Sequence, residues 1–108
     1  MPSIPQLEKL LAADPTDAFV LYALAQEHAK AGDHPTAVTF YDRCLAEDEA
    51  YCYAYFHKAR SQEAMGDRAA AADTLTAGLA VSQRAGDQKA AGEIGGYLVE
   101  VQTAEPNG

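Results

Sequence analysis

The sequence has no apolar segment long enough to cross a membrane. A spanning helix needs roughly 18 apolar residues in succession, and no stretch of these 108 residues approaches that length, although 48% of them are hydrophobic. The first 14 residues also lack the basic start, the continuous apolar stretch and the cleavage site of a signal peptide. We therefore expect one cytoplasmic domain with a hydrophobic core and no membrane partner.

Basic residues are also scarce. The chain has 8 Lys and Arg residues against 16 Asp and Glu residues, which gives a formal net charge of −8. Binding to a phosphate backbone requires a basic surface, so we expect no nucleic-acid partner. A solvated acidic surface is the simplest interpretation of this charge, and an acidic groove for basic partners is the alternative.

Potential metal ligands are few and poorly spaced. The soft ligands are the cysteines Cys44 and Cys52 and the histidines His28, His34 and His57. No pair of them has the close double spacing of a structural zinc site. In a cytosolic chain, cysteines outside a C-x-x-C pair are expected to be reduced and to behave as small apolar residues. We expect no metal and no other cofactor.

Catalytic patterns are missing as well. A nucleophile needs a base beside it and a donor for the oxyanion. Cys52 and His57 are five positions apart and would point to different sides of a helix. The glycine-rich segment GEIGG, residues 92–96, follows no expected strand and lacks the lysine of a phosphate-binding loop. The sequence therefore predicts a protein without enzymatic activity.

What the chain does contain is an internal repeat. The segments AKAGDHPTA, residues 29–37, and EAMGDRAAA, residues 63–71, share a Gly-Asp pair followed by Ala four residues after the Asp. Gly32 and Gly66 are 34 residues apart. At this offset, small or apolar residues recur at equivalent positions: Leu7, Tyr41 and Leu75; Leu11, Leu45 and Leu79; Ala12, Ala46 and Ala80; Ala25 and Ala59; Ala37 and Ala71. Residues of these types occupy the interfaces between packed helices.

Each period reads as a helix, a tight turn and a second helix. Residues 18–31 contain no Gly or Pro and are rich in strong helix formers. Gly32 follows where a left-handed C-cap would lie, Asp33 can cap the next helix, and Pro35 suits its first turn. The second helix carries an apolar stripe at the spacing of a core-facing helix, formed by Ala37, Phe40, Tyr41, Cys44 and Leu45.

This period and these paired helices resemble the tetratricopeptide repeat family, in particular a small bacterial-type member. In the first copy, Leu24 and Ala37 match the family pattern. Leu21 stands in the place of its Trp, and Tyr41 in the place of its Phe. The residues of the second copy that fit the pattern are Tyr55, Ala59, Ala71 and Leu75.

The second copy departs from the pattern in its second helix. Thr74 and Gly78 fall on the expected core face there, so we expect this helix to pack more loosely than its counterpart. A weaker apolar signal near the C-terminus comes from Ile94, Tyr97, Leu98 and Val101, which lie on one face of a predicted last helix.

The resemblance implies an all-α fold, an α-α superhelix of about six helices in a right-handed stack. We expect a single domain over residues 1–108, with two full repeats, a half-repeat helix before them and a capping helix after them. The expected segments are the N-terminal helix 3–14, repeat one 18–51, repeat two 52–85, the capping helix 87–103 and a disordered tail 104–108.

The resemblance also implies a function. In this family the first helices of successive repeats line a concave groove that binds an extended peptide or a partner helix. The matching positions here are Phe19, Tyr22, Gln26, Tyr53, Phe56 and Arg60, with Lys30 and His57 nearby. Aromatic rings beside Arg and amide groups are typical of a binding surface. We therefore expect a non-catalytic adaptor for a protein or peptide partner.

Two alternatives accompany this hypothesis. The terminal helices could fold over the groove and bury its rings. The chain could instead be a self-assembly module that forms a weak homo-oligomer, if Leu7, Leu10 and Ile94 at the two ends are incompletely covered. A carboxylate clamp for heat-shock chaperones is not expected, because Tyr22 and Gln26 occupy the positions of the first Lys and Asn of that clamp.

Overall fold

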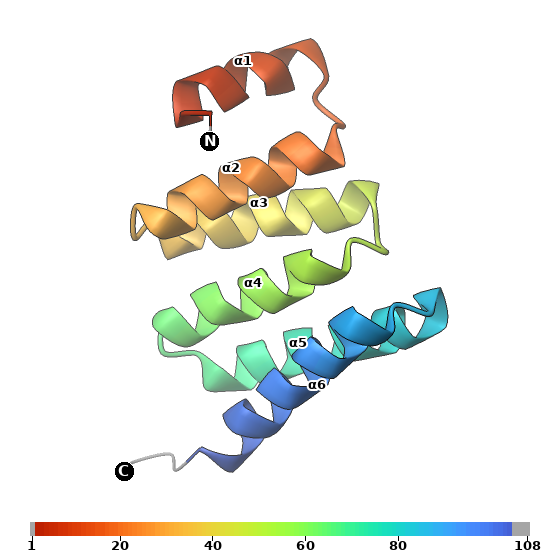
Figure 1. The fold of residues 1–108 in the computed structure, drawn as a ribbon. Coiled ribbons are helices and arrows are strands. Elements are labelled where there is room, and N and C mark those ends of the chain that lie inside the picture. Colours follow the sequence, from red (N-terminus) through yellow and green to blue (C-terminus); the bar gives the residue numbers. More distant parts are fainter. Residues whose placement is uncertain (1, 105–108) are drawn as a thin grey trace.

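Six helices stack in chain order, with no strand among the residues described (Figure 1). The structure, a computed structural model, describes residues 2–104. Its helices are α1 Ile4–Ala13, α2 Ala18–Lys30, α3 His34–Glu47, α4 Cys52–Ala64, α5 Arg68–Ala85 and α6 Gln88–Thr103. The expected all-α repeat fold is confirmed. The expected disordered tail lies outside the described residues, apart from Ala104.

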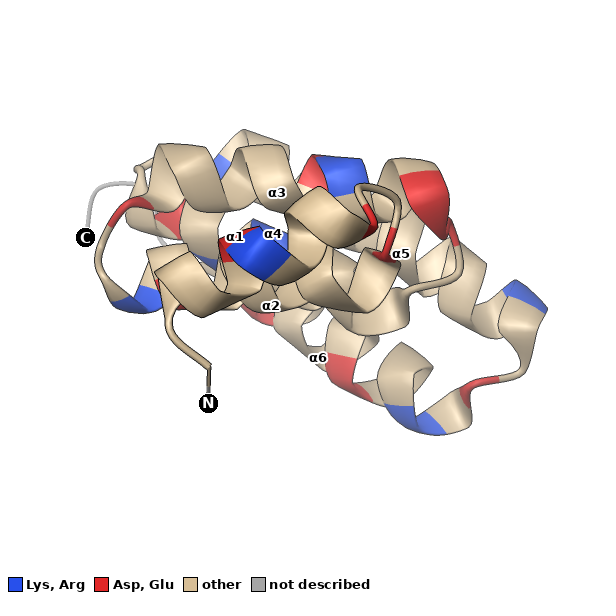
Figure 2. Cartoon of the chain, turned by 90° about the horizontal axis from the view of Figure 1, so that it is seen from above, with Lys and Arg blue, Asp and Glu red and all other residues tan. Residues whose placement is uncertain are grey.

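Short polar side chains fix where the helices begin. Asp33 accepts a hydrogen bond from the backbone N–H of Thr36 at the start of α3, and Asp17, Asp67 and Asp87 cap α2, α5 and α6 in the same manner. Ser3 forms a reciprocal capping box with Gln6 at the start of α1. Four of the helices therefore begin at an aspartate, and acidic residues colour several of the connecting loops in Figure 2.

The two Gly-Asp turns of the repeat have the same backbone conformation. Gly32 and Gly66 both have φ of +83°, in the left-handed region. In both turns the N–H of the following Asp bonds to a carbonyl five residues back, at His28 and Gln62, which satisfies an otherwise free helix-end acceptor. The predicted left-handed C-cap at Gly32 is confirmed, and the repeat of the sequence is a repeat of geometry.

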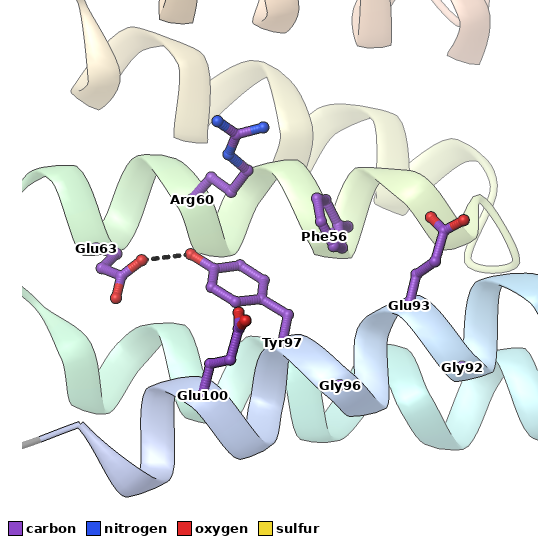
Figure 3. A pocket seen from close by; sticks show the side chains of 8 residues that line it. All are labelled: Phe56, Arg60, Glu63, Gly92, Glu93, Gly96, Tyr97 and Glu100. Carbon is purple, nitrogen blue, oxygen red and sulfur yellow. Dashed lines mark hydrogen bonds between the residues drawn. The ribbon is translucent and has the colours of Figure 1, made fainter.

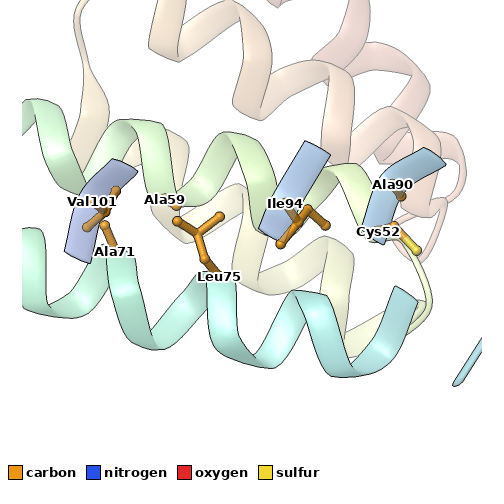
Figure 4. Packing of buried hydrophobic residues seen from close by; sticks show 7 residues of the cluster. All are labelled: Cys52, Ala59, Ala71, Leu75, Ala90, Ile94 and Val101. Atoms are coloured by element: carbon orange, nitrogen blue, oxygen red, sulfur yellow. The ribbon is translucent and has the colours of Figure 1, made fainter. Parts of the chain in front are cut away.

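The repeat also recurs in the hydrophobic core. Ala25, Ala59, Ala37 and Ala71 are all fully buried, and their small side chains let the helix backbones approach closely. One cluster lies between α1 and α2 around Leu7. Two further clusters follow along the stack, centred on Tyr41 and on Leu75 with Ile94 (Figure 4). Each helix pair is thus closed by the first helix of the next.

The expectation of loose packing in α5 is wrong at its glycine. A Cβ built on Gly78 would lie 2.5 Å from the Cβ of Tyr55 on α4, so α4 and α5 approach closely there. Thr74 donates a hydrogen bond to the side-chain oxygen of Gln62 at 2.6 Å. The polar and small residues on this face are used for close approach and for a hydrogen bond between helices.

The last helix takes the place of a further first helix. It packs on α5 as α4 packs on α3, and it contacts α4 as α4 contacts α2. Its buried residues Ile94 and Val101 cover the α4–α5 pair. Arg68 on α5 donates a hydrogen bond to the carbonyl of Ala104 at 3.1 Å, which holds the end of α6 against α5.

Candidate functional site

Two adjacent hollows open on the face formed by α2, α4 and α6. The first, called here the α2–α4 hollow, has a volume of about 380 Å³ and is lined by Gln26, Ala29, Lys30, His34, Tyr41, His57, Arg60, Ser61 and Ala64. The second, called the α4–α6 pocket, has a volume of about 600 Å³ and is lined by Phe56, Arg60, Glu63, Gly92, Glu93, Gly96, Tyr97 and Glu100. Arg60 lines both, so the two meet at its side chain.

The α2–α4 hollow brings together four of the residues predicted for the groove: Gln26, Lys30, His57 and Arg60. The hydroxyl of Tyr41 donates a hydrogen bond to the side-chain oxygen of Gln26. Lys30 pairs with Glu27 at 2.8 Å on the same helix. Polar groups therefore line this hollow, and some of them are already held by neighbours.

Neutral aromatic side chains lie beside this hollow, in contact with His57 of its lining. The ring of Tyr22 lies 4.8 Å from that of Tyr51, and it also contacts the ring of His57 at 6.0 Å between centroids. Burial raises the pKa of Tyr22 to about 12, with a further contribution from Tyr51. Burial, and then the nearby Arg60, lowers the pKa of His57 below its ordinary value of 6.5. Both side chains are therefore neutral at pH 7.

The α4–α6 pocket has an aromatic side and an acidic rim (Figure 3). The rings of Phe56 and Tyr97 lie 5.2 Å apart at an angle of 51°. The hydroxyl of Tyr97 donates a hydrogen bond to Glu63 at 2.6 Å. Burial first, and this hydrogen bond second, raise the pKa of Tyr97 far above its ordinary value. The phenol is thus a fixed donor.

Ring contacts continue across the face from α2 to α6. Tyr22 contacts His57, His57 contacts Phe56 at 5.2 Å, and Phe56 contacts Tyr97. These four half-buried side chains are called here the aromatic row. The alternative in which terminal helices bury the predicted rings describes part of the structure, because α6 packs against Phe56 through Tyr97 while Phe19 on α2 is 64% exposed.

Three of the predicted residues line neither hollow. Tyr22 lies next to the first hollow through its contact with His57, and the other two, Phe19 and Tyr53, lie farther from the row. Phe19 is 64% exposed at the start of α2. Tyr53 is half-buried and packs against the core cluster of α4, α5 and α6. Burial, and then a hydrogen bond with Glu93, raises its pKa. Neither side chain contributes to the shape of the two hollows.

The repeat offset missed the residues that α6 supplies. An offset of 34 places Ile94 opposite Arg60, whereas the structure places Tyr97 in the pocket beside it. The reason is that α5 has 18 residues and α3 has 14, which shifts the helix that follows. The extra length of the uninterrupted segment between Asp67 and Gly86 was the available signal.

Within residues 2–104, no three His, Cys, Asp or Glu side chains are grouped so that they could hold a metal ion. In the same range, no helix combines the length and apolar character that a bilayer crossing requires. A cytoplasmic location and the lack of a nucleic-acid partner stay predictions.

Comparison with known proteins gives a consistent picture. No protein-family model matches the sequence. A TPR repeat-containing protein of Pseudomonas aeruginosa is 30% identical over 101 residues, which are 94% of this chain and 96% of that protein. A tetratricopeptide repeat domain protein from Salinibacter ruber is 30% identical, with a TM-score of 0.79 over 85% of this chain and 93% of its own.

A third likeness concerns the fold alone. The TPR2B domain of yeast Sti1, solved in a complex with pHsp70, has a TM-score of 0.85 and covers 92% of this chain. The alignment spans 79% of that domain, and the two sequences are 23% identical. The helical stack over most of this chain is therefore shared with these domains.

Proposed function

The chain belongs to the tetratricopeptide repeat family, and we propose that its α2–α4–α6 face binds a segment of a partner protein. Members of this family are protein-interaction modules and not enzymes, and this chain is one of them. The proposal specifies which surface of this chain contacts the partner. It places the bound segment along the aromatic row, across the two hollows.

The observation that carries the proposal is the continuity of the aromatic row. Rings in contact with one another have little freedom left to lose when a partner binds. Half-buried rings also present apolar area without exposing a large patch to water. Beside the row, Gln26, Lys30 and Arg60 offer polar groups to the backbone of an extended peptide. Phe19 and Tyr53 are left out of this surface.

Capture of partners from a lysate of the source organism tests the proposal. The baits are the wild-type chain and a Tyr22→Ala, Phe56→Ala variant whose helix content is verified by circular dichroism. The control bait is Phe19→Ala, which removes an exposed ring outside both hollows. We expect a protein that the wild type and the control retain and the double variant loses. Retention of the same proteins by all three baits would contradict the proposal.

The alternative of end-to-end self-assembly has lost part of its basis. Leu7 and Ile94 are 1% and 0% exposed, so the expectation that they are incompletely covered is wrong. Leu10 is 52% exposed on α1, as expected, and Val99 is 57% exposed on α6 at the other end of the stack. We expect light scattering to give the monomer mass at high concentration, and a mass that grows with concentration would restore the alternative.

A further inference from the structure

We propose that the α4–α6 pocket receives a Lys or Arg side chain of the bound segment. This inference rests on the proposed function and adds the chemistry of one contact to it. It follows from three properties of the pocket: uncompensated negative charge, an aromatic side, and a floor without side chains.

The first property is the charge of the lining. Three carboxylates, from Glu63, Glu93 and Glu100, face one guanidinium, that of Arg60. Among residues 2–104, no Lys or Arg nitrogen lies within 4.0 Å of these three carboxylates. Arg60 extends from α4 on the side away from Glu100 (Figure 3). An incoming cation would therefore meet acceptors that have no ion-pair partner.

The second property is the aromatic side. Lys and Arg carry a long apolar stem below the charge, and an Arg or Lys cation is attracted to the face of an aromatic ring. Phe56 and Tyr97 supply two such rings at the base of the acidic rim. The hydrogen bond from Tyr97 to Glu63 holds ring and carboxylate together. The geometry suits a side chain that is apolar along its length and cationic at its end.

The third property is the floor of the pocket. Gly92 and Gly96 lie one turn apart on α6, and a Cβ added to either would meet nothing within 4 Å. The backbone of α6 is bare at this point, which leaves room for the main chain of a bound peptide. A larger residue at either of these two positions would project into the pocket (Figure 3).

The adjacent hollow has the opposite character. Lys30, Arg60 and two histidines line it, and its lining contains no carboxylate. The face is thus acidic at its α6 end and basic or neutral at its α2 end. A protein with a net charge of −8 attracts a basic segment over distance, and the pocket gives the basic residue a defined place. This assignment favours the acidic-groove interpretation of the charge over the solvated-surface one.

Peptide titration followed by nuclear magnetic resonance tests the inference. The probes are the blocked tripeptides acetyl-Ala-Arg-Ala-amide and acetyl-Ala-Lys-Ala-amide, with acetyl-Ala-Gln-Ala-amide as the neutral counterpart. We expect the basic peptides to shift the amide signals of Gly92, Gly96 and Tyr97 in a saturable manner, and the Gln peptide to leave them unchanged. Equal shifts with all three peptides would overturn the inference.

Two variants of equal charge make the test specific. Glu93→Gln, Glu100→Gln removes two carboxylates of the pocket, and Glu8→Gln, Glu47→Gln removes two exposed carboxylates on α1 and α3. Exposed ion pairs are individually weak, so we expect the first variant to weaken basic-peptide binding by roughly five- to tenfold and the second to leave it nearly unchanged. Equal weakening by both would reduce the effect to net charge and overturn the inference.

A filled pocket gives an independent check. Gly96→Gln keeps every charge and places a side chain on the floor, and we expect it to abolish the shifts caused by the basic peptides. Tighter binding of spermidine than of the Arg peptide would identify a free polyamine as the occupant and overturn the inference. If a captured partner is lost by the Tyr22→Ala, Phe56→Ala bait but retained in full by Glu93→Gln, Glu100→Gln, the proposed function stands and this inference fails.

Discussion

Tyr97 on the last helix donates its phenolic hydrogen bond to Glu63 on α4, with 2.6 Å between the two oxygens. This contact joins side chains 34 residues apart and links the two walls of the α4–α6 pocket. The acceptor is a carboxylate, and hydrogen bonds to charged groups are the stronger ones. This hydrogen bond therefore holds the two walls of the pocket together without a bound ligand.

Removing this hydroxyl is expected to loosen α6. Tyr97→Phe keeps the ring and deletes the donor, and we expect a loss of about 1 kcal/mol in the free energy of unfolding. Urea denaturation measures it. Glu63→Gln is the companion variant, because its amide oxygen still accepts the bond and the loss should be smaller. Equal stability of wild type and Tyr97→Phe would contradict the prediction.

The same substitution is expected to act in opposite directions at two glycines. Gly32→Ala forces a side chain into a left-handed conformation, at a cost of about 1 kcal/mol or more. Gly92→Ala lies within α6 and meets no atom within 4 Å, so it should stabilise the chain by about 0.5–1 kcal/mol. Thermal unfolding by circular dichroism compares the two. Melting temperatures that move in the same direction would refute one of the two assignments.

At Gly78, space is expected to outweigh helix propensity. Ala is the better helix former, but its Cβ would fall 2.5 Å from the Cβ of Tyr55. Overpacking of a core typically costs about 1–3 kcal/mol, so Gly78→Ala should lower the free energy of unfolding. Gly96→Ala, which meets nothing within 4 Å, is the control. A stabilised Gly78→Ala variant would show that α4 and α5 separate easily.

Alkaline pH is expected to unfold the chain through its tyrosines. All six have pKa values raised above 10.0, with burial as the main cause. The folded state then retains protons that the unfolded state has released, so stability is complete below about pH 10 and falls as the pH rises towards 12. Melting temperatures between pH 8 and pH 11 measure this fall, and Tyr22→Phe should make it shallower. Tyrosinate absorbance that titrates normally in the folded chain would contradict the prediction.

Local signals in the sequence were enough to predict the helices. Asp33 and Pro35 start a helix and Gly32 ends one for reasons that lie within a few residues of each. The segment YCYAYFH, residues 51–57, alternates like a strand, yet the repeat offset placed it in a first helix, as in α4. The 34-residue repeat and the capping residues were therefore enough to predict where the helices lie.

The pocket could not be predicted in the same way. Its two walls come from helices whose relative position depends on the length of α5, and the repeat offset no longer applies beyond that helix. The sequence identified Phe56 and Arg60 on one wall and placed Tyr97 on a face that was expected to be core. Whether Gly78 marked a gap or a close contact depended on where the ring of Tyr55 lay, which no local pattern specifies.

The position of α6 in the described stack links ligand binding in the α4–α6 pocket to local unfolding of this helix. Every other first helix in the stack is followed by a partner helix, but the outer face of α6 is not covered by a further described helix. Transient detachment of α6 would therefore dismantle one wall of the pocket and uncover Ile94 and Val101 in the same event. A ligand bound in the pocket would hold α6 against α4. Amide hydrogen exchange along α6 would then slow as the fraction of occupied pockets rises.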